Sequence, residues 1–141
     1  MVTAGDSGEK QRYEALSNFR YMLRCFLRFS EDAARDEGIT ALQYQLMLHT
    51  QGIEGRNWAA ISEIAERLQM QVHGAVALVT RCEEAGLVRR KPSDRDRRQV
   101  EVHLLPAGRR TLARLASQHS AQLSSLVEAV TLASRVDDDR P

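Results

Sequence analysis

Residues 87–110 read LVRRKPSDRDRRQVEVHLLPAGRR. Two short runs with β-branched and alternating residues, 87–91 and 99–104, flank a polar segment, 92–97. Because proline, serine and aspartate favour turns, this pattern predicts a β-hairpin with a long charged loop. The proline at position 106 suits the first turn of a helix, so a helix is expected directly after the second strand.

Charge is unevenly distributed along the chain. Residues 87–110 hold eight Lys or Arg and three Asp or Glu, a balance of +5, whereas the whole chain carries +1. The remaining residues therefore sum to −4. Since electrostatic attraction is local, a basic segment in a slightly acidic protein indicates a contact with a polyanion. On charge alone, a merely solvated charged loop remains the alternative.

Three short helices are predicted before the hairpin. Thr40 stands three residues before Gln43, the spacing of a capping box, and begins the first of them. Apolar residues at spacings of three and four then define two more, the last ending at Gly86. Their apolar positions are Tyr44, Met47 and Leu48; Ile61, Ile64, Ala65 and Leu68; and Ala75, Leu78, Val79 and Cys82.

A long amphipathic helix is predicted at each end of the chain, over 9–36 and 106–134. Gly38 would end the first. Two such apolar stripes are more surface than a 141-residue monomer can easily cover, so both helices are expected to form a homodimer. The alternative is that they pack back onto the central part. Residues 1–8 are expected to be disordered and 135–141 to form a flexible tail.

The order of elements over 37–105 is that of a winged helix-turn-helix, in a mainly α (α+β) fold with dimerisation helices on both sides. A helix about 10–12 Å wide fits the DNA major groove, and an arginine-rich hairpin can reach the minor groove. Double-stranded DNA is therefore the expected partner. Candidate contacts to bases are Gln71, Val72 and His73, and candidates for phosphate are Ser62 and Arg81, with Arg89 and Arg90 as weaker ones. At the hairpin tip the candidates are Arg95, Arg97 and Arg98, with Asp96 expected to hold the loop by pairing with an arginine.

The chain resembles the MarR (multiple antibiotic resistance regulator) family of transcription factors over residues 12–130. The resemblance is carried by Ile61–Leu68, by Leu78–Arg90 and by Asp94–Arg98 leading to Leu104–Arg109. Asp96-Arg97-Arg98 matches the family's D-x-R wing motif, which makes Arg98 the first candidate for insertion into the minor groove. Departures are Gln71–Ala77, which lacks the usual small hydroxyl residues and arginine, and Leu105, which replaces a capping threonine.

The resemblance implies a homodimer whose terminal helices intertwine and whose two winged domains bind a pseudo-palindromic operator. It also implies a repressor that a small aromatic effector releases from DNA, by entering the crevice between the dimer helices and the winged domain. A winged-helix module that binds a protein partner is one alternative. The other is a redox-sensing regulator that uses Cys25.

Other function classes find no support in the sequence. No catalytic triad, glycine-rich phosphate loop or carboxylate pair is present, so no enzyme activity is expected. His49, His103 and His119 have no metal-ligand spacing, and no metal or cofactor is expected. Cys82 lies on an apolar stripe and is predicted to be a core residue. Without a long apolar run, neither a membrane span nor a signal peptide is expected, and the predicted location is the cytoplasm.

Overall fold

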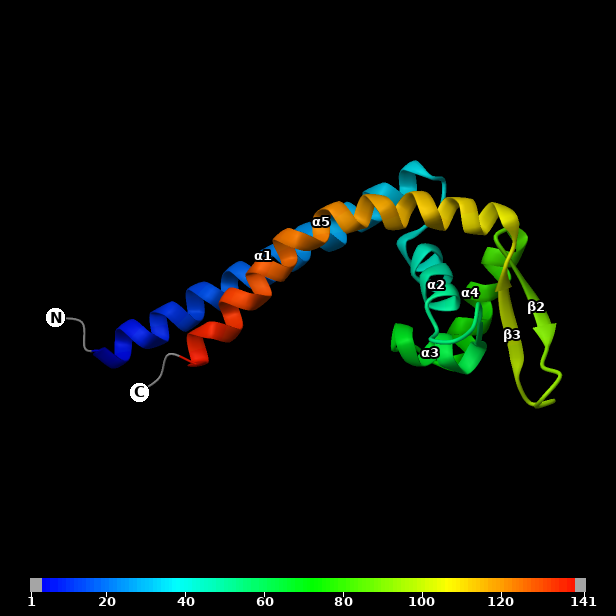
Figure 1. The fold of residues 1–141 in the computed structure, drawn as a ribbon, viewed down its shortest axis with the longest axis horizontal. Helices are drawn as coiled ribbons and strands as arrows, with labels where there is room; N and C mark the ends of the chain where they lie inside the picture. The colour runs from blue at the N-terminus through cyan, green and yellow to red at the C-terminus, as the bar shows by residue number, and fades with distance from the viewer. Residues whose placement is uncertain (1–3, 139–141) are drawn as a thin grey trace. The chain divides into compact units, whose positions relative to one another are not determined.

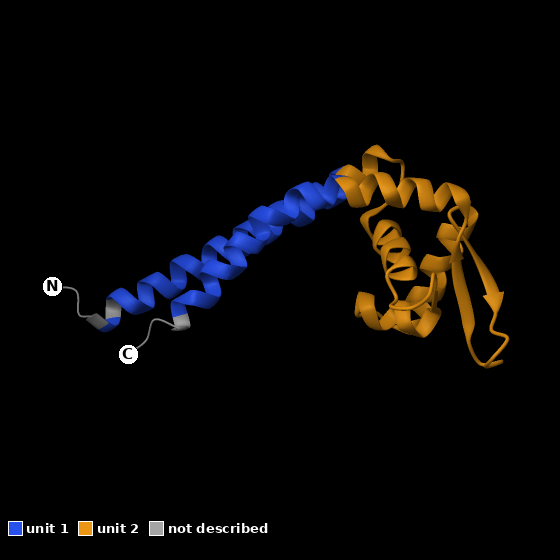
Figure 2. Ribbon diagram, in the orientation of Figure 1, with its two compact units in different colours: residues 1–32, 118–141 blue, residues 33–117 orange. Residues whose placement is uncertain are grey.

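The computed structural model describes residues 4–138, and it confirms the mainly helical fold with a small sheet. The elements are α1 (Ala4–Asp36), α2 (Ala41–Gln51), β1 (Trp58–Ala60), α3 (Ile61–Leu68), α4 (Val72–Glu84), β2 (Val88–Pro92), β3 (Val100–Leu104) and α5 (Pro106–Asp138). They form two compact units (Figure 2). Unit 1 comprises residues 1–32 and 118–141, and unit 2 comprises residues 33–117.

Unit 1 is a pair of antiparallel helices, formed by the first part of α1 and the last part of α5 (Figure 1). They pack around His119, which is 5% exposed. Its Nε2 lies 2.8 Å from Ser30 Oγ, and the rings of Phe26 and Phe29 meet its ring edge-on. The edge-to-face geometry favours aromatic contact, and the hydroxyl satisfies a buried ring nitrogen.

Both long helices extend beyond their predicted bounds. α1 begins at Ala4 and not at residue 9, and α5 ends at Asp138 and not at residue 134. Residues 4–8 and 135–138 are thus helical, which corrects the expectation of a disordered start and a flexible tail for these positions. The rest of that expectation, 1–3 and 139–141, lies outside the described residues.

The helices of unit 2 begin where their capping groups stand. Thr40 Oγ1 accepts the N–H of Gln43 at 3.1 Å, and Gln43 Oε1 accepts the N–H of Thr40 at 2.9 Å, which confirms the predicted capping box of α2. No hydroxyl precedes α3; there Glu63 Oε1 accepts the N–H of Ala60 at 2.9 Å. Gly86 has φ +74°, the left-handed conformation that glycine adopts most easily, and so lets the chain turn from α4 into β2.

The sheet has three antiparallel strands in the order β1-β3-β2. The two strands of the hairpin were predicted, whereas β1 was not. This strand has only three residues, two of them alanines, so it carries no β-branched signal. Trp58 is a strand residue opposite His103; its ring stacks on the imidazole, and the Arg56 guanidinium lies 4.0 Å from the indole.

The core of unit 2 lies between its helices and the inner face of the sheet. Among its fully buried side chains are Leu46, Met47, Ile64, Leu78, Val79, Cys82, Val88, Val102 and Leu115. This set contains one or more residues from each of α2, α3, α4, β2, β3 and α5, so the packing of α4 and of the hairpin depends on the same core.

Candidate nucleic-acid interface

α4 is the second helix of the helix-turn-helix and presents an exposed N-terminal end. A three-residue turn, 69–71, joins it to α3, and Gln69 in that turn has φ +52°. Gln71 and His73 are exposed, and Val72 keeps 55% of its surface exposed. One turn later Val76 is 40% exposed.

The exposed groups at this end of α4 can hydrogen-bond and make apolar contacts. Glutamine and histidine can bond to base edges, and valine methyl groups suit the thymine methyl. Arg81 is exposed near the C-terminal end of α4, and Ser62 is exposed in the first turn of α3. Gln71, Val72, His73, Arg81 and Ser62 are thus all exposed. Their contacts with DNA stay predictions.

In the hairpin loop, residues 93–99, backbone N–H groups donate hydrogen bonds to acceptors within the same loop and so fix its shape. Ser93 is 8% exposed, and its Oγ accepts the N–H groups of Arg95 and Asp96, each at 3.2 Å. Its own N–H donates to the carbonyl of Gln99 at 3.2 Å. The sequence analysis missed Ser93, although a serine after proline is a recognised turn signal.

Asp96 supports the same loop, but not as predicted. Its Oδ1 accepts the backbone N–H of Arg98 at 3.0 Å, and its carbonyl accepts the N–H of Gln99. Over residues 4–138 it forms no ion pair with an arginine side chain, which corrects the expected pairing. The physical reason is that the turn places an amide within reach of the short carboxylate, which leaves the long guanidinium groups in water.

Arg95, Arg97 and Arg98 are exposed on this loop. Within the described chain, none of their guanidinium groups has a hydrogen-bond or ion-pair partner on the protein. Arg90 differs from them, since its guanidinium bonds to α4, so it is not available to a phosphate in the way the sequence suggested. The loop therefore presents three uncompensated cations on a backbone that is already ordered.

The two cysteines lie in different environments. Cys82 is fully buried in unit 2, as predicted, and burial raises the pKa of its thiol to about 11. Little thiolate is therefore present near neutral pH. Cys25, the candidate for redox chemistry, is an exposed free thiol on α1. Among the described residues no group of three or more His, Cys, Asp or Glu could hold a metal ion, and no described helix could cross a membrane.

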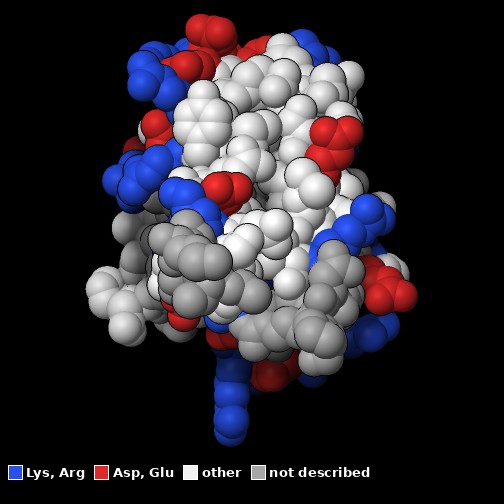
Figure 3. Space-filling view, turned by 90° about the vertical axis from the view of Figure 1, so that its left-hand side faces the viewer, with Lys and Arg blue, Asp and Glu red and all other residues white. Residues whose placement is uncertain are grey.

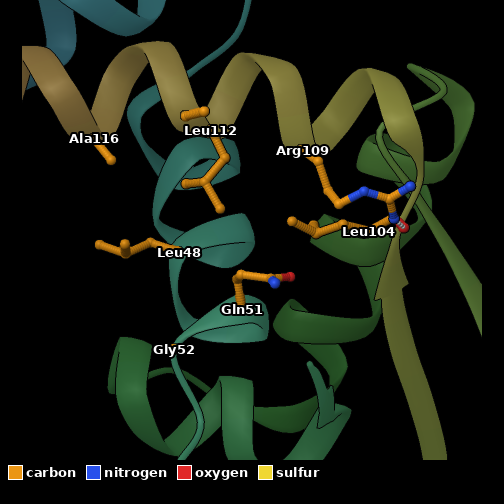
Figure 4. A pocket seen from close by; sticks show the side chains of 8 residues that line it. Leu48, Gln51, Gly52, Leu104, Arg109, Leu112 and Ala116 are labelled. Atoms are coloured by element: carbon orange, nitrogen blue, oxygen red, sulfur yellow. Dashed lines mark hydrogen bonds between the residues drawn. The ribbon is translucent and has the colours of Figure 1, made fainter. Parts of the chain in front are cut away.

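Unit 2 also contains an apolar cavity of about 370 Å³ between the end of α2, the end of β3 and the start of α5 (Figure 4). Leu48, Leu112 and Ala116 form apolar parts of its wall. Arg109 is the only charged residue among those that line it, and Nη1 of Arg109 donates to the carbonyl of Leu104 at 2.9 Å. One cation in an apolar wall suits a small ligand with an aromatic body and an anionic group.

These features define a class of protein: unit 2 is a winged helix-turn-helix, with α3 and α4 as the helix pair and β2 and β3 as the wing. A sequence model of the MarR family matches residues 37–99. This match confirms the resemblance to the MarR family that was inferred from the sequence, over the winged part of the chain. A search of curated proteins found no match.

Solved structures share the fold along most of the chain. AbsC, a MarR family transcriptional regulator from Streptomyces coelicolor, is 22% identical with a TM-score of 0.69, and 89% of this chain and 80% of AbsC are covered. Apo wild-type MarR from E. coli is 16% identical, with a TM-score of 0.67 and coverage of 100% and 98%. A mutant E. coli MarR complexed with operator DNA is 18% identical, with a TM-score of 0.67 and coverage of 86% and 90%.

Proposed function

We propose that the protein is a transcriptional regulator that binds double-stranded DNA as a homodimer. The observation that carries the proposal is the wing loop, in which Ser93 and Asp96 hold the backbone while three neighbouring arginines remain unpaired. Such a loop inserts cations into a groove without a large ordering cost. The fold shared with MarR in complex with operator DNA supports the same assignment.

In this proposal each protomer contacts DNA in two ways. The exposed end of α4, with Gln71, Val72 and His73, lies in the major groove, while Arg98 and its neighbours contact the flanking minor groove. Arg81 and Ser62 bind phosphates, which sets the position of the protein but not its sequence preference. Since α4 offers no arginine in its first turn, we expect discrimination between bases to depend strongly on DNA shape at the wing.

The homodimer is supported by the unpaired apolar surface of unit 1. Seen from the end of the helix pair where the chain begins and ends, uncharged side chains form a broad area between charged ones (Figure 3). Large apolar side chains of unit 1 stay exposed at Tyr13, Leu16, Tyr21, Leu27, Leu123, Val127, Val130 and Leu132. Monomeric proteins rarely expose this much apolar surface, so a second copy is its expected cover.

Repression and release by an effector complete the proposal. A dimer bound across a promoter blocks polymerase, and a ligand that favours another spacing of the two winged units lowers DNA affinity. The cavity beside Arg109 is the place where we expect a small aromatic acid to bind. As a regulator of this kind the protein carries out no chemistry of its own and acts in the cytoplasm.

The first test is a titration of promoter fragments from the source genome at several salt concentrations, with wild type and Arg98→Ala. We expect wild type to lose affinity steeply with salt, because phosphate contacts release counterions. Arg98→Ala should weaken binding by roughly 1–3 kcal/mol without shifting the thermal unfolding midpoint. Arg135→Ala, an exposed arginine on α5, serves as the control and should bind like wild type.

Two results would count against this assignment. If wild type binds no fragment even at low salt, the protein is not a DNA-binding regulator, and a winged-helix module for a protein partner becomes the better interpretation. If wild type binds but Arg98→Ala has unchanged affinity, the wing does not contact DNA as proposed.

The effector site has its own test, with 2-hydroxybenzoate as the probe. At about 100 times its dissociation constant the probe should raise the free energy of unfolding by about 2.7 kcal/mol. Arg109→Met, which removes the only cation of the wall, should lose most of this gain, and so should Ala116→Leu, which fills the cavity and keeps the charge. Equal stabilisation of wild type and both variants would place the site elsewhere.

A further inference from the structure

Arg90 connects the wing to α4 by an unusual number of bonds. Its backbone N–H donates to Glu83 Oε2 at 2.8 Å, and Nη1 donates to Glu83 Oε1 at 2.9 Å. The second terminal nitrogen, Nη2, donates to Thr80 Oγ1 at 2.6 Å and to the carbonyl of Val76 at 3.0 Å. One residue of β2 thus meets three positions of α4.

These acceptors lie on one face of the helix, because positions 76, 80 and 83 are separated by four and three residues. The Thr80 hydroxyl donates to the same Val76 carbonyl at 3.1 Å, which orients its lone pairs towards the guanidinium. Both partners of the ion pair are partly shielded, with 28% of the Arg90 side chain and 38% of the Glu83 side chain exposed. Charge-assisted bonds in such surroundings are stronger and more directional than those between neutral groups.

The backbone bond to Glu83 has a second consequence. β2 is an edge strand, since β3 lies between it and β1, so its outward N–H groups have no neighbouring strand. The Glu83 carboxylate satisfies one of these groups, and a shift of β2 along α4 by one residue, about 3.3 Å, would break all four bonds at once. Arg90 therefore specifies how the hairpin is aligned along α4.

Small errors of alignment grow towards the wing tip. Arg95 is five residues beyond Arg90, up to about 17 Å of extended strand, so a tilt of about 10° at Arg90 would move the tip by roughly 3 Å. A displacement of this size exceeds the reach of a hydrogen bond. The arginines of the loop can contact the groove beside α4 only if this angle is kept.

We propose that Arg90 is a positioning residue, which with Glu83 and Thr80 fixes the wing relative to α4 so that both can engage one half-site together. The inference rests on the proposed function only where it concerns DNA binding. Its structural part concerns the protein without DNA, and the two parts can be tested separately.

The test compares wild type with Arg90→Met and Glu83→Gln, and with Arg114→Met as the matched control. Arg114 makes a two-pronged ion pair with Glu37, at 3.0 and 2.9 Å, so its substitution removes the same chemistry away from the wing. In the DNA-free proteins, amide hydrogen exchange over 88–92 and 100–104 should become about tenfold faster in Arg90→Met, while α2 and α3 exchange at the wild-type rate. Glu83→Gln should change exchange in the same direction and by less.

On a fragment that wild type binds, hydroxyl-radical footprinting should separate positioning from general stability. Arg90→Met should lose protection at the flanking minor groove while protection beside the major-groove contact remains, with affinity lowered about tenfold or more. Arg114→Met should keep both footprints. If Arg90→Met loses both together, or exchanges and binds like wild type, Arg90 has no positioning role. A wild type without any footprint contradicts the proposed function, while the exchange rates still decide the part played by Arg90.

Discussion

A Gly108→Ala variant is expected to lose most of its folding stability, by about 3 kcal/mol or more. Gly108 lies in the first turn of α5, where the backbone of Leu87 passes directly against it. A methyl group at Gly108 would lie 2.1 Å from the carbonyl oxygen of Leu87, and 3.0 and 3.3 Å from its C and Cα. These are backbone atoms that cannot rotate away. The same oxygen accepts the N–H of Leu105 at 2.9 Å, so moving it would also break this bond.

The measurement is chemical denaturation followed by circular dichroism, and the chain offers a matched glycine control. Gly74 lies in the first turn of α4, where a methyl group would meet only the end of the flexible Met70 side chain, at 3.3 Å. Because alanine favours a helix over glycine, Gly74→Ala should gain about 0.5 kcal/mol. A Gly108→Ala variant as stable as wild type would show that α5 does not approach Leu87 as described.

The sequence predicted most elements of the fold because their signals are local. A capping box, a glycine after a helix and a spacing of three and four between apolar residues each depend on neighbours along the chain. Strand β1 has no such signal. Its three residues are extended because they pair with β3 more than 40 positions away, through contacts such as Ala59 with Val102.

The candidate site was predicted in part, for a related reason. Residue type and place in the hairpin identified the loop arginines, and these are the side chains that remain unpaired. The same reasoning treated Arg89 and Arg90 alike, although successive strand residues point to opposite faces. Alternation alone would have placed one of the two towards the helices. The bonds of Arg90 to Glu83 and Thr80 depend on how β2 packs against α4, and no local sequence pattern contains that information.

The way Asp96 acts shows the limit of reasoning from charge. An aspartate between arginines suggests an ion pair, yet exposed ion pairs contribute little and cost side-chain entropy. The carboxylate instead accepts the amide of Arg98, two residues ahead, as is common for aspartate in turns. For DNA binding the difference matters, because an arginine paired with Asp96 would have to break that pair before it met a phosphate.

A Val127→Asp variant is expected to dissociate the proposed homodimer and to weaken operator binding by more than a hundredfold. On α5, Leu123, Val127 and Val130 follow a helical spacing and are 44%, 58% and 47% exposed, so they form one apolar stripe of unit 1. An ionised carboxylate in the middle of an interface formed by this stripe would lose its water without gaining a partner. Each winged unit would then bind its half-site alone and lose the effective concentration that the second one supplies.

Sedimentation velocity over a range of protein concentrations measures the dissociation, and the same samples can be titrated with DNA. Ser125→Asp is the matched control, since it adds the same charge to an exposed position two residues away, on the other side of α5. It should sediment and bind DNA like wild type. Were Val127→Asp to stay dimeric with unchanged affinity, this stripe would not be the dimer interface. Were wild type itself monomeric at every concentration, two half-sites could not be bound by one assembly, and the proposal of a homodimeric regulator would fail.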